Sequence, residues 1–237
     1  MGIVQWALLI AVALAGLTGA ASVHHQRRFR RDMARLARRL KLHYTPEDRL
    51  DLLARFDELP LVRQGHNRRT GHVITGATPY GSVTCFRLAY EIGSGGLREV
   101  RQWMLAVLET ECDLPFLVLT PADDRDGATD VWSDLVSEDA TEWTQQGPTR
   151  VWRHVLDDTA TAAWPSGCAP VERTLAVLAD KPTAFGLVLQ GSRIAACSPT
   201  PGAAGIAEAA MDVVIEYARR VRDHLDSVGS DADAATE

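Results

Sequence analysis

The first apolar stretch of the chain is long enough to cross a membrane. From Ile3 to Val23 there are 21 consecutive residues without a charge, and a helix rising about 1.5 Å per residue would carry them about 32 Å. Because a bilayer core is about 30 Å thick, the pattern predicts one transmembrane helix over residues 3–23. A cleaved secretory signal is the competing interpretation, since Gly19, Ala20 and Ala21 are small. Such signals, however, carry positive charge before the apolar stretch, and here the arginines follow it.

Residues 24–44 have the pattern of a basic amphipathic helix. Phe29, Met33, Leu36 and Leu40 recur at helical spacing. The other positions hold eight basic residues, which we expect to face a membrane surface: Arg27, Arg28, Arg30, Arg31, Arg35, Arg38, Arg39 and Lys41. Two interpretations stay open. The helix lies on anionic lipid, or its apolar side packs on the following domain or on a second copy of the chain.

The same basic residues predict an orientation. Lys and Arg close to a span are retained on the cytoplasmic side, so we expect the N-terminus outside the cell membrane and the domain inside. Within the span, Gly16 and Ala20, or Ala15 and Gly19, have the small-residue spacing that lets two helices approach closely. A homodimer through the span or the basic helix is the corresponding prediction.

One soluble domain is predicted over residues 45–225. Thr45 and Pro46, followed by two acids, predict a helix that starts there and ends before Pro60. Residues 97–110 fit a helix face as well as a strand face, and we interpret them as a strand because a Gly-rich turn joins them to residues 82–92.

Alternation of apolar and polar residues predicts the other strands, at residues 70–77, 82–92, 116–119 and 149–155, and a hairpin of 185–189 with 193–197. Helical spacing predicts a helix over residues 170–178 and a long one over 205–225. The fold class is therefore α+β, with a mainly antiparallel sheet and a long C-terminal helix. The acidic residues 226–237 have few apolar side chains and are predicted to be a disordered tail.

Charge and cysteine spacing exclude several functions. From residue 42 onward there are 17 basic residues against 30 acidic, so the domain is poorly suited to neutralising nucleic-acid phosphates. Cys85, Cys112, Cys168 and Cys197 contain no CxxC pair, and no phosphate-binding loop, HExxH or dinucleotide motif occurs. We therefore expect no metal site, no cofactor and no nucleic-acid partner.

Several short motifs carry a resemblance. They are the segment from Leu59 to Arg69, then Val73-Ile74-Thr75-Gly76, Cys85-Phe86 with Tyr90, and Leu114-Pro115-Phe116 before an acidic loop. Together they resemble a group of bacterial membrane-anchored proteins that have one N-terminal span, a basic stretch and one soluble domain, over about residues 45–225. The group has no assigned activity to transfer. This chain has Arg87 and Leu97 where the group tends to have Asp and Lys.

The candidate ligand site is the segment from Gln64 to Arg69. A glycine before turn-forming residues can direct backbone N–H groups at an anion, and His66, Arg68 and Arg69 would add positive charge. The alternative is a solvated strand start. The function predicted from the sequence is a membrane-tethered, non-catalytic binding or scaffolding module. A membrane-associated hydrolase is the alternative, with Cys85 or Cys168 paired to His66, His72 or His154.

Overall fold

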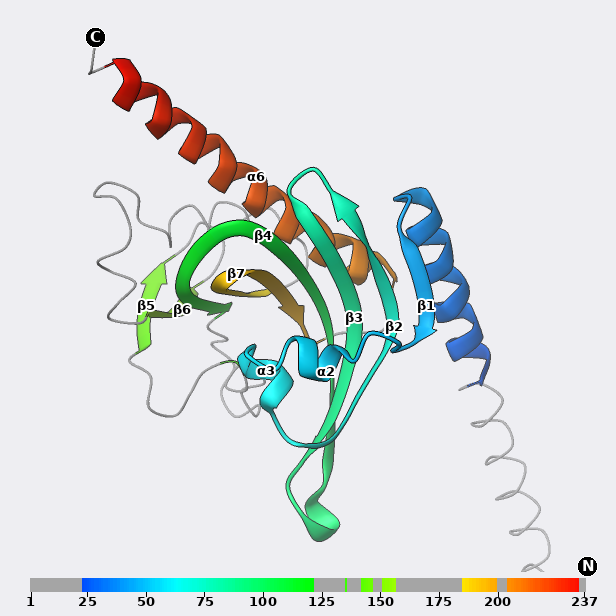
Figure 1. Cartoon of the computed structure of the whole chain (residues 1–237). Helices are drawn as coiled ribbons and strands as arrows, with labels where there is room; N and C mark the ends of the chain where they lie inside the picture. The colour runs from blue at the N-terminus through cyan, green and yellow to red at the C-terminus, as the bar shows by residue number, and fades with distance from the viewer. Residues whose placement is uncertain are drawn as a thin grey trace, which may run out of the picture.

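A strongly bent antiparallel sheet organises the protein (Figure 1). The computed structural model describes residues 23–121, 135, 142–146, 151–156, 185–199 and 204–234. Its seven strands have the order β1-β2-β3-β4-β6-β5, and β7 pairs with β4. The strands are β1 His43–Glu47, β2 His66–Thr78, β3 Gly81–Ile92, β4 Glu99–Pro121, β5 Glu142–Gln146, β6 Val151–Leu156 and β7 Gly186–Ser198.

The helices lie on both faces of the sheet. They are a helix over residues 23–39, α2 Leu52–Arg55, α3 Pro60–Arg63, the 3-10 turn η1 Gly95–Leu97 and α6 Ala204–Ala234. This arrangement confirms the predicted α+β class with a mainly antiparallel sheet and a C-terminal helix. Residues 226–234 continue α6, although the sequence predicted a disordered tail there.

Alternating side chains of the strands supply a core on each face. One core joins the helix of residues 23–39 and α6 to strand residues of one parity, among them Val83, Cys85, Met104 and Ala106. The other core covers strand residues of the opposite parity with α2 and α3, and it contains Phe86, Leu88, Tyr90, Trp103 and Leu105. Because both faces are buried, the central strands are apolar at almost every position.

The helix of residues 23–39 is part of this packing. Its apolar side chains Phe29, Met33 and Leu36 are buried in the core that it shares with α6. Of the two interpretations of its apolar side, packing on the domain is the one that the structure shows. The seven arginines on the rest of its surface are exposed, and so is Lys41 in the turn that follows the helix.

Two local predictions are wrong. Thr45 and Pro46 do not start a helix but lie in β1, where Thr45 is opposite Val73. Proline is tolerated there because β1 is an edge strand. The helix begins later, after Asp48, whose carboxylate accepts hydrogen bonds at 2.9 Å from the backbone N–H groups of Leu50 and Leu52.

The predicted hairpin around Gly191 is also wrong. β7 is one continuous strand of 13 residues beside β4, and Gly191 lies within it at φ 54°, opposite Leu114. Register shifts on both sides of Leu114 mark a bulged region in which β4 bends. The two strands predicted at 97–110 and 116–119 are parts of the single 23-residue strand β4, which begins at Glu99 after the turn η1.

The predicted transmembrane helix lies almost entirely outside the residues that the structure describes. In the part of the chain that is described, no helix is long and apolar enough to cross a membrane. The predicted span of residues 3–23 lies outside that part, apart from Val23, and so does the predicted helix over residues 170–178.

Candidate functional site

The predicted ligand site lies where β2 begins, beside the far end of β3. His66 is paired with Glu91 in the strand register, and its Nε2 atom is 3.6 Å from the Glu91 carboxylate. The side chains of Asn67 and Arg98 also reach that carboxylate, at 3.0 and 3.6 Å. A carboxylate of the protein itself therefore occupies the position where an anionic ligand would meet His66.

The two arginines of the segment have different surroundings. Arg68 donates a hydrogen bond at 3.0 Å to the carbonyl of Val62, at the end of α3. Arg69 is exposed and lies opposite Ala89. Gly65 has φ +63°, and a Cβ atom there would lie 2.4 Å from the Glu91 carbonyl oxygen. The glycine thus permits close approach of two strands, and the basic side chains around it face solvent.

The two cysteines whose side chains the structure describes, Cys85 and Cys197, are not placed as nucleophiles. Cys85 is completely buried, its sulfur lies 3.9 Å from the carbonyl oxygen of Ala207 in α6, and burial raises the pKa of its thiol. Burial also raises the pKa of Cys197 to about 12. Since the thiolate is the reactive species, neither cysteine is activated. Cys168 lies outside the described residues.

His72 forms a polar cluster between the helix of residues 23–39 and the sheet. Its Nδ1 atom lies 3.0 Å from the Tyr44 hydroxyl. Its ring makes an edge-to-face contact with the Phe29 ring, with 4.8 Å between the two ring centroids. Burial, with Arg87 and then Arg30 nearby, lowers the pKa of His72 to about 4. The ring is therefore neutral at pH 7, and its contacts join the helix to β1 and β2.

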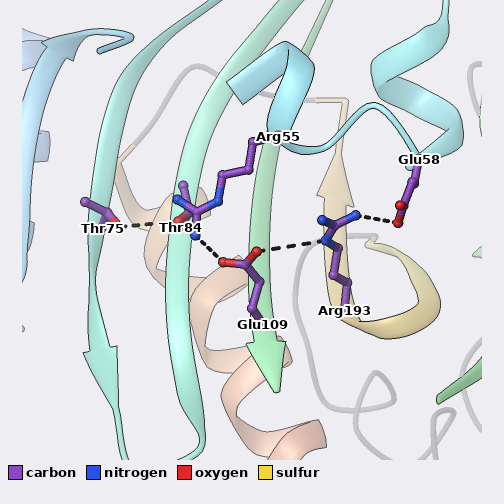
Figure 2. Close-up of polar contacts among 6 residues, drawn as sticks. All are labelled: Arg55, Glu58, Thr75, Thr84, Glu109 and Arg193. Atoms are coloured by element: carbon purple, nitrogen blue, oxygen red, sulfur yellow. Dashed lines mark hydrogen bonds and ion pairs between the residues drawn. The ribbon is translucent and has the colours of Figure 1, made fainter. Parts of the chain in front are cut away.

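A chain of charged side chains crosses the face that carries α2 (Figure 2). Arg55 of α2 is paired with Glu109 of β4, which lies 4.0 Å from Arg193 of β7. Arg193 is also 2.6 Å from Glu58. The guanidinium carbons of Arg55 and Arg193 lie 5.3 and 5.6 Å from the centre of the Phe56 ring. Every charge in this group has an opposite neighbour, so its evident role is to join α2 to the sheet.

A cleft of about 460 Å³ lies where the turn between β2 and β3 meets the bend of β4 and the helix α6. Its wall combines the apolar side chains of Leu114, Ile194 and Ala218 with the charged side chains of Glu111 and Arg222. Arg222 also donates a hydrogen bond at 3.3 Å to the carbonyl of Pro79 in the turn. A volume of this size and a mixed wall suit a small amphipathic molecule.

Metal binding finds no support among the described side chains, which contain no group of three or more His, Cys, Asp or Glu residues that could hold an ion.

Comparison with known proteins gives a fold and no family. No family model matches the chain, and no curated protein matches it. The crystal structure of the mycobacterial trehalose monomycolate transport factor A, TtfA, is similar, with a TM-score of 0.56 and 14% sequence identity over 83% of this chain and 96% of that one. This likeness shows a shared fold. At that identity it shows nothing about what this chain binds.

No sequence pattern predicted the cleft or the chain of charged side chains. The residues 78–81 that line the cleft form a tight turn with Gly81 at φ +139°, and Arg222 is 143 residues away from Pro79. The alternation of the strands did contain a sign of the chain of charged side chains. Glu109 and Arg193 are charges at positions where the alternation of their strands calls for an inward side chain.

Proposed function

We propose that this protein is a membrane-tethered, non-catalytic binding module. Residues 3–23 form the tether as a transmembrane helix, the helix of residues 23–39 joins it to the domain, and the cleft beside α6 takes the ligand. The domain lies on the cytoplasmic side of the cell membrane, with anionic lipid against the arginines.

One observation carries the proposal. The uncharged stretch leads directly into a helix whose apolar side is buried in the domain while all its basic residues are exposed. A helix joined to the core in this way holds the domain at a fixed place beside the membrane, and exposed arginines near a surface each add about 1 kcal/mol of attraction to anionic lipid.

The binding role rests on the cleft and on the surroundings of the cysteines. The cleft mixes apolar side chains with the charged side chains of Glu111 and Arg222, and its volume lies in the range of small-molecule sites. Cys85, one of the two cysteines on which the hydrolase alternative depended, is buried against α6. The similar fold of TtfA, a protein described as a transport factor, agrees with a role other than catalysis.

The tether is tested on the full chain in cells. We expect the protein to remain in the membrane fraction after washing with alkaline carbonate, and a reporter fused after Glu237 to be active only in the cytoplasm. Release by carbonate would refute the span. An active alkaline phosphatase fusion at the same point would reverse the orientation.

The cleft is tested by filling it. We expect native mass spectrometry of the chain purified in mild detergent to show a co-purifying small molecule, and Ala218→Phe to lose it. Ala218→Ser is the control, because it leaves the cleft open. Equal occupancy in both variants, or a wild-type chain without any bound molecule, would refute binding in this cleft.

A further inference from the structure

The hairpin of β3 and β4 projects beyond the rest of the sheet (Figure 1). Its turn holds the most exposed large apolar side chain among the described residues, Leu97, which is 87% exposed, and Val100 close by is 59% exposed. Cβ atoms built on Gly95 or Gly96 would meet nothing within 4 Å. Leu97 is therefore left uncovered by the described residues, although apolar side chains in the rest of the sheet are buried on both faces.

The tip lies at the end of the molecule where the helix of residues 23–39 begins (Figure 1). Phe29 of the helix and Arg87 of β3 lie at about the same height along the molecule. Phe29 contacts His72 of β2, and the adjacent Gly71 is opposite Arg87. From Phe29 back to Val23 the helix extends about 9 Å. From Arg87 to Ile92 the strand extends about 17 Å toward the same end of the molecule, before the turn is counted (Figure 1). Because this strand segment is longer than the helix segment, the tip lies beyond the first residue of the helix.

Basic side chains surround this end of the molecule. The first nine residues of the helix contribute four exposed arginines, and Arg68, Arg69 and Arg98 are exposed beside the hairpin. The acids at the same place are Glu91, which is shared by His66, Asn67 and Arg98, and Glu99, which is paired with Arg101. Asp32, which lies 3.9 Å from Arg28, and Glu47 and Asp48, beside the first half of β2, complete the set. The local balance is basic, whereas the domain as a whole is acidic.

We propose that the tip of the β3–β4 hairpin inserts into the headgroup region of the membrane that holds the tether, with Leu97 as the inserted side chain and Arg68, Arg69 and Arg98 on lipid phosphates. This inference rests on the proposed transmembrane tether. A tip that lies beyond the start of the helix agrees with insertion to the depth of about 5–10 Å at which apolar side chains of interfacial elements lie. It also gives the segment from His66 to Arg69 a ligand that lies outside the fold, at the membrane surface.

The test uses the full chain reconstituted in vesicles of phosphatidylcholine and phosphatidylglycerol. A small fluorophore is attached to Leu97→Cys and, as a matched control, to Ala77→Cys, which is exposed at the opposite end of β2. The unsubstituted chain, carrying its own four cysteines, measures background labelling. Lipids with a nitroxide in the headgroup or the upper acyl chain act as the quencher. Gly96→Cys provides a second label position in the turn.

We expect quenching to be at least about threefold stronger at positions 97 and 96 than at position 77, because interfacial insertion places a label within contact of the nitroxide. Equal and weak quenching in a chain that floats with the vesicles would refute the inserted tip and leave the tether standing. A chain that does not float with the vesicles would refute both. A disulfide between two Leu97→Cys chains, without quenching, would show that the tip contacts a second copy and would also overturn the proposal.

Discussion

Replacing Met33 with alanine tests whether the basic helix is part of the domain. The Met33 side chain is completely buried, in the core that the helix shares with the sheet and α6. The substitution removes three heavy atoms from that core and leaves a cavity, which costs about 2–5 kcal/mol in protein cores. We take about 3 kcal/mol as the expected loss in the free energy of unfolding, which is a large part of the roughly 5–15 kcal/mol that stabilises a domain.

The loss can be measured by urea unfolding of the full chain in mild detergent, followed by tryptophan fluorescence. Trp103 is buried in the sheet, so its emission reports on the core. With a urea dependence of about 2 kcal/mol per molar for a domain of this size, the midpoint should fall by about 1.5 M. Met33→Leu preserves the volume and should cost less than about 1.5 kcal/mol.

The matched control is Arg31→Ala on the exposed side of the same helix. We expect it to change the free energy of unfolding by less than about 0.5 kcal/mol. If Met33→Ala is as mild as Arg31→Ala, the helix is a separate stalk and its packing on the sheet contributes no stability. The proposal that it holds the domain at a fixed place beside the membrane would then fail.

Three further predictions concern the sheet. Burial, reinforced by two arginines, lowers the pKa of His72 to about 4. The unfolded chain therefore binds a proton at His72 more readily than the folded chain, and the stabilisation present above pH about 6.5 is lost as the pH falls toward 4. Allowing for solvent screening, wild type should lose about 1 kcal/mol more than His72→Asn between pH 7 and pH 5 in urea titrations, and equal losses would contradict this. At Gly81, where φ is +139° and a Cβ atom would lie 2.0 Å from the Glu109 carbonyl oxygen, alanine should cost more than about 3 kcal/mol by thermal unfolding. Gly96→Ala, with no atom within 4 Å of the new Cβ, should be nearly neutral, and similar losses would exclude the clash. Glu109→Gln should cost about 1–3 kcal/mol because two arginines lose a charged partner. Glu58→Gln, at the exposed end of the chain of charged side chains, should cost less than about 1 kcal/mol, and the reverse order would refute this assignment.

The candidate sites show how far sequence patterns reach. Composition located the basic residues of the first helix and of the segment from His66 to Arg69, because charge density is visible along the chain. It could not show that Glu91, 25 residues after His66, brings its carboxylate to this segment. The cleft likewise depends on Arg222 reaching the turn at Pro79, and no local pattern connects them.

The sequence by itself determined the elements whose pattern repeats over many residues. The helix of residues 23–39, the strand at 82–92 and the helix α6 each keep one period for three or more turns or alternations, because each has to present apolar side chains to a core at regular positions. The tertiary structure alone decided that Thr45 and Pro46 join an edge strand and that β7 continues through Gly191. Both depend on a neighbouring strand, since β1 and β7 gain their backbone hydrogen bonds from β2 and β4, which lie far from them in sequence.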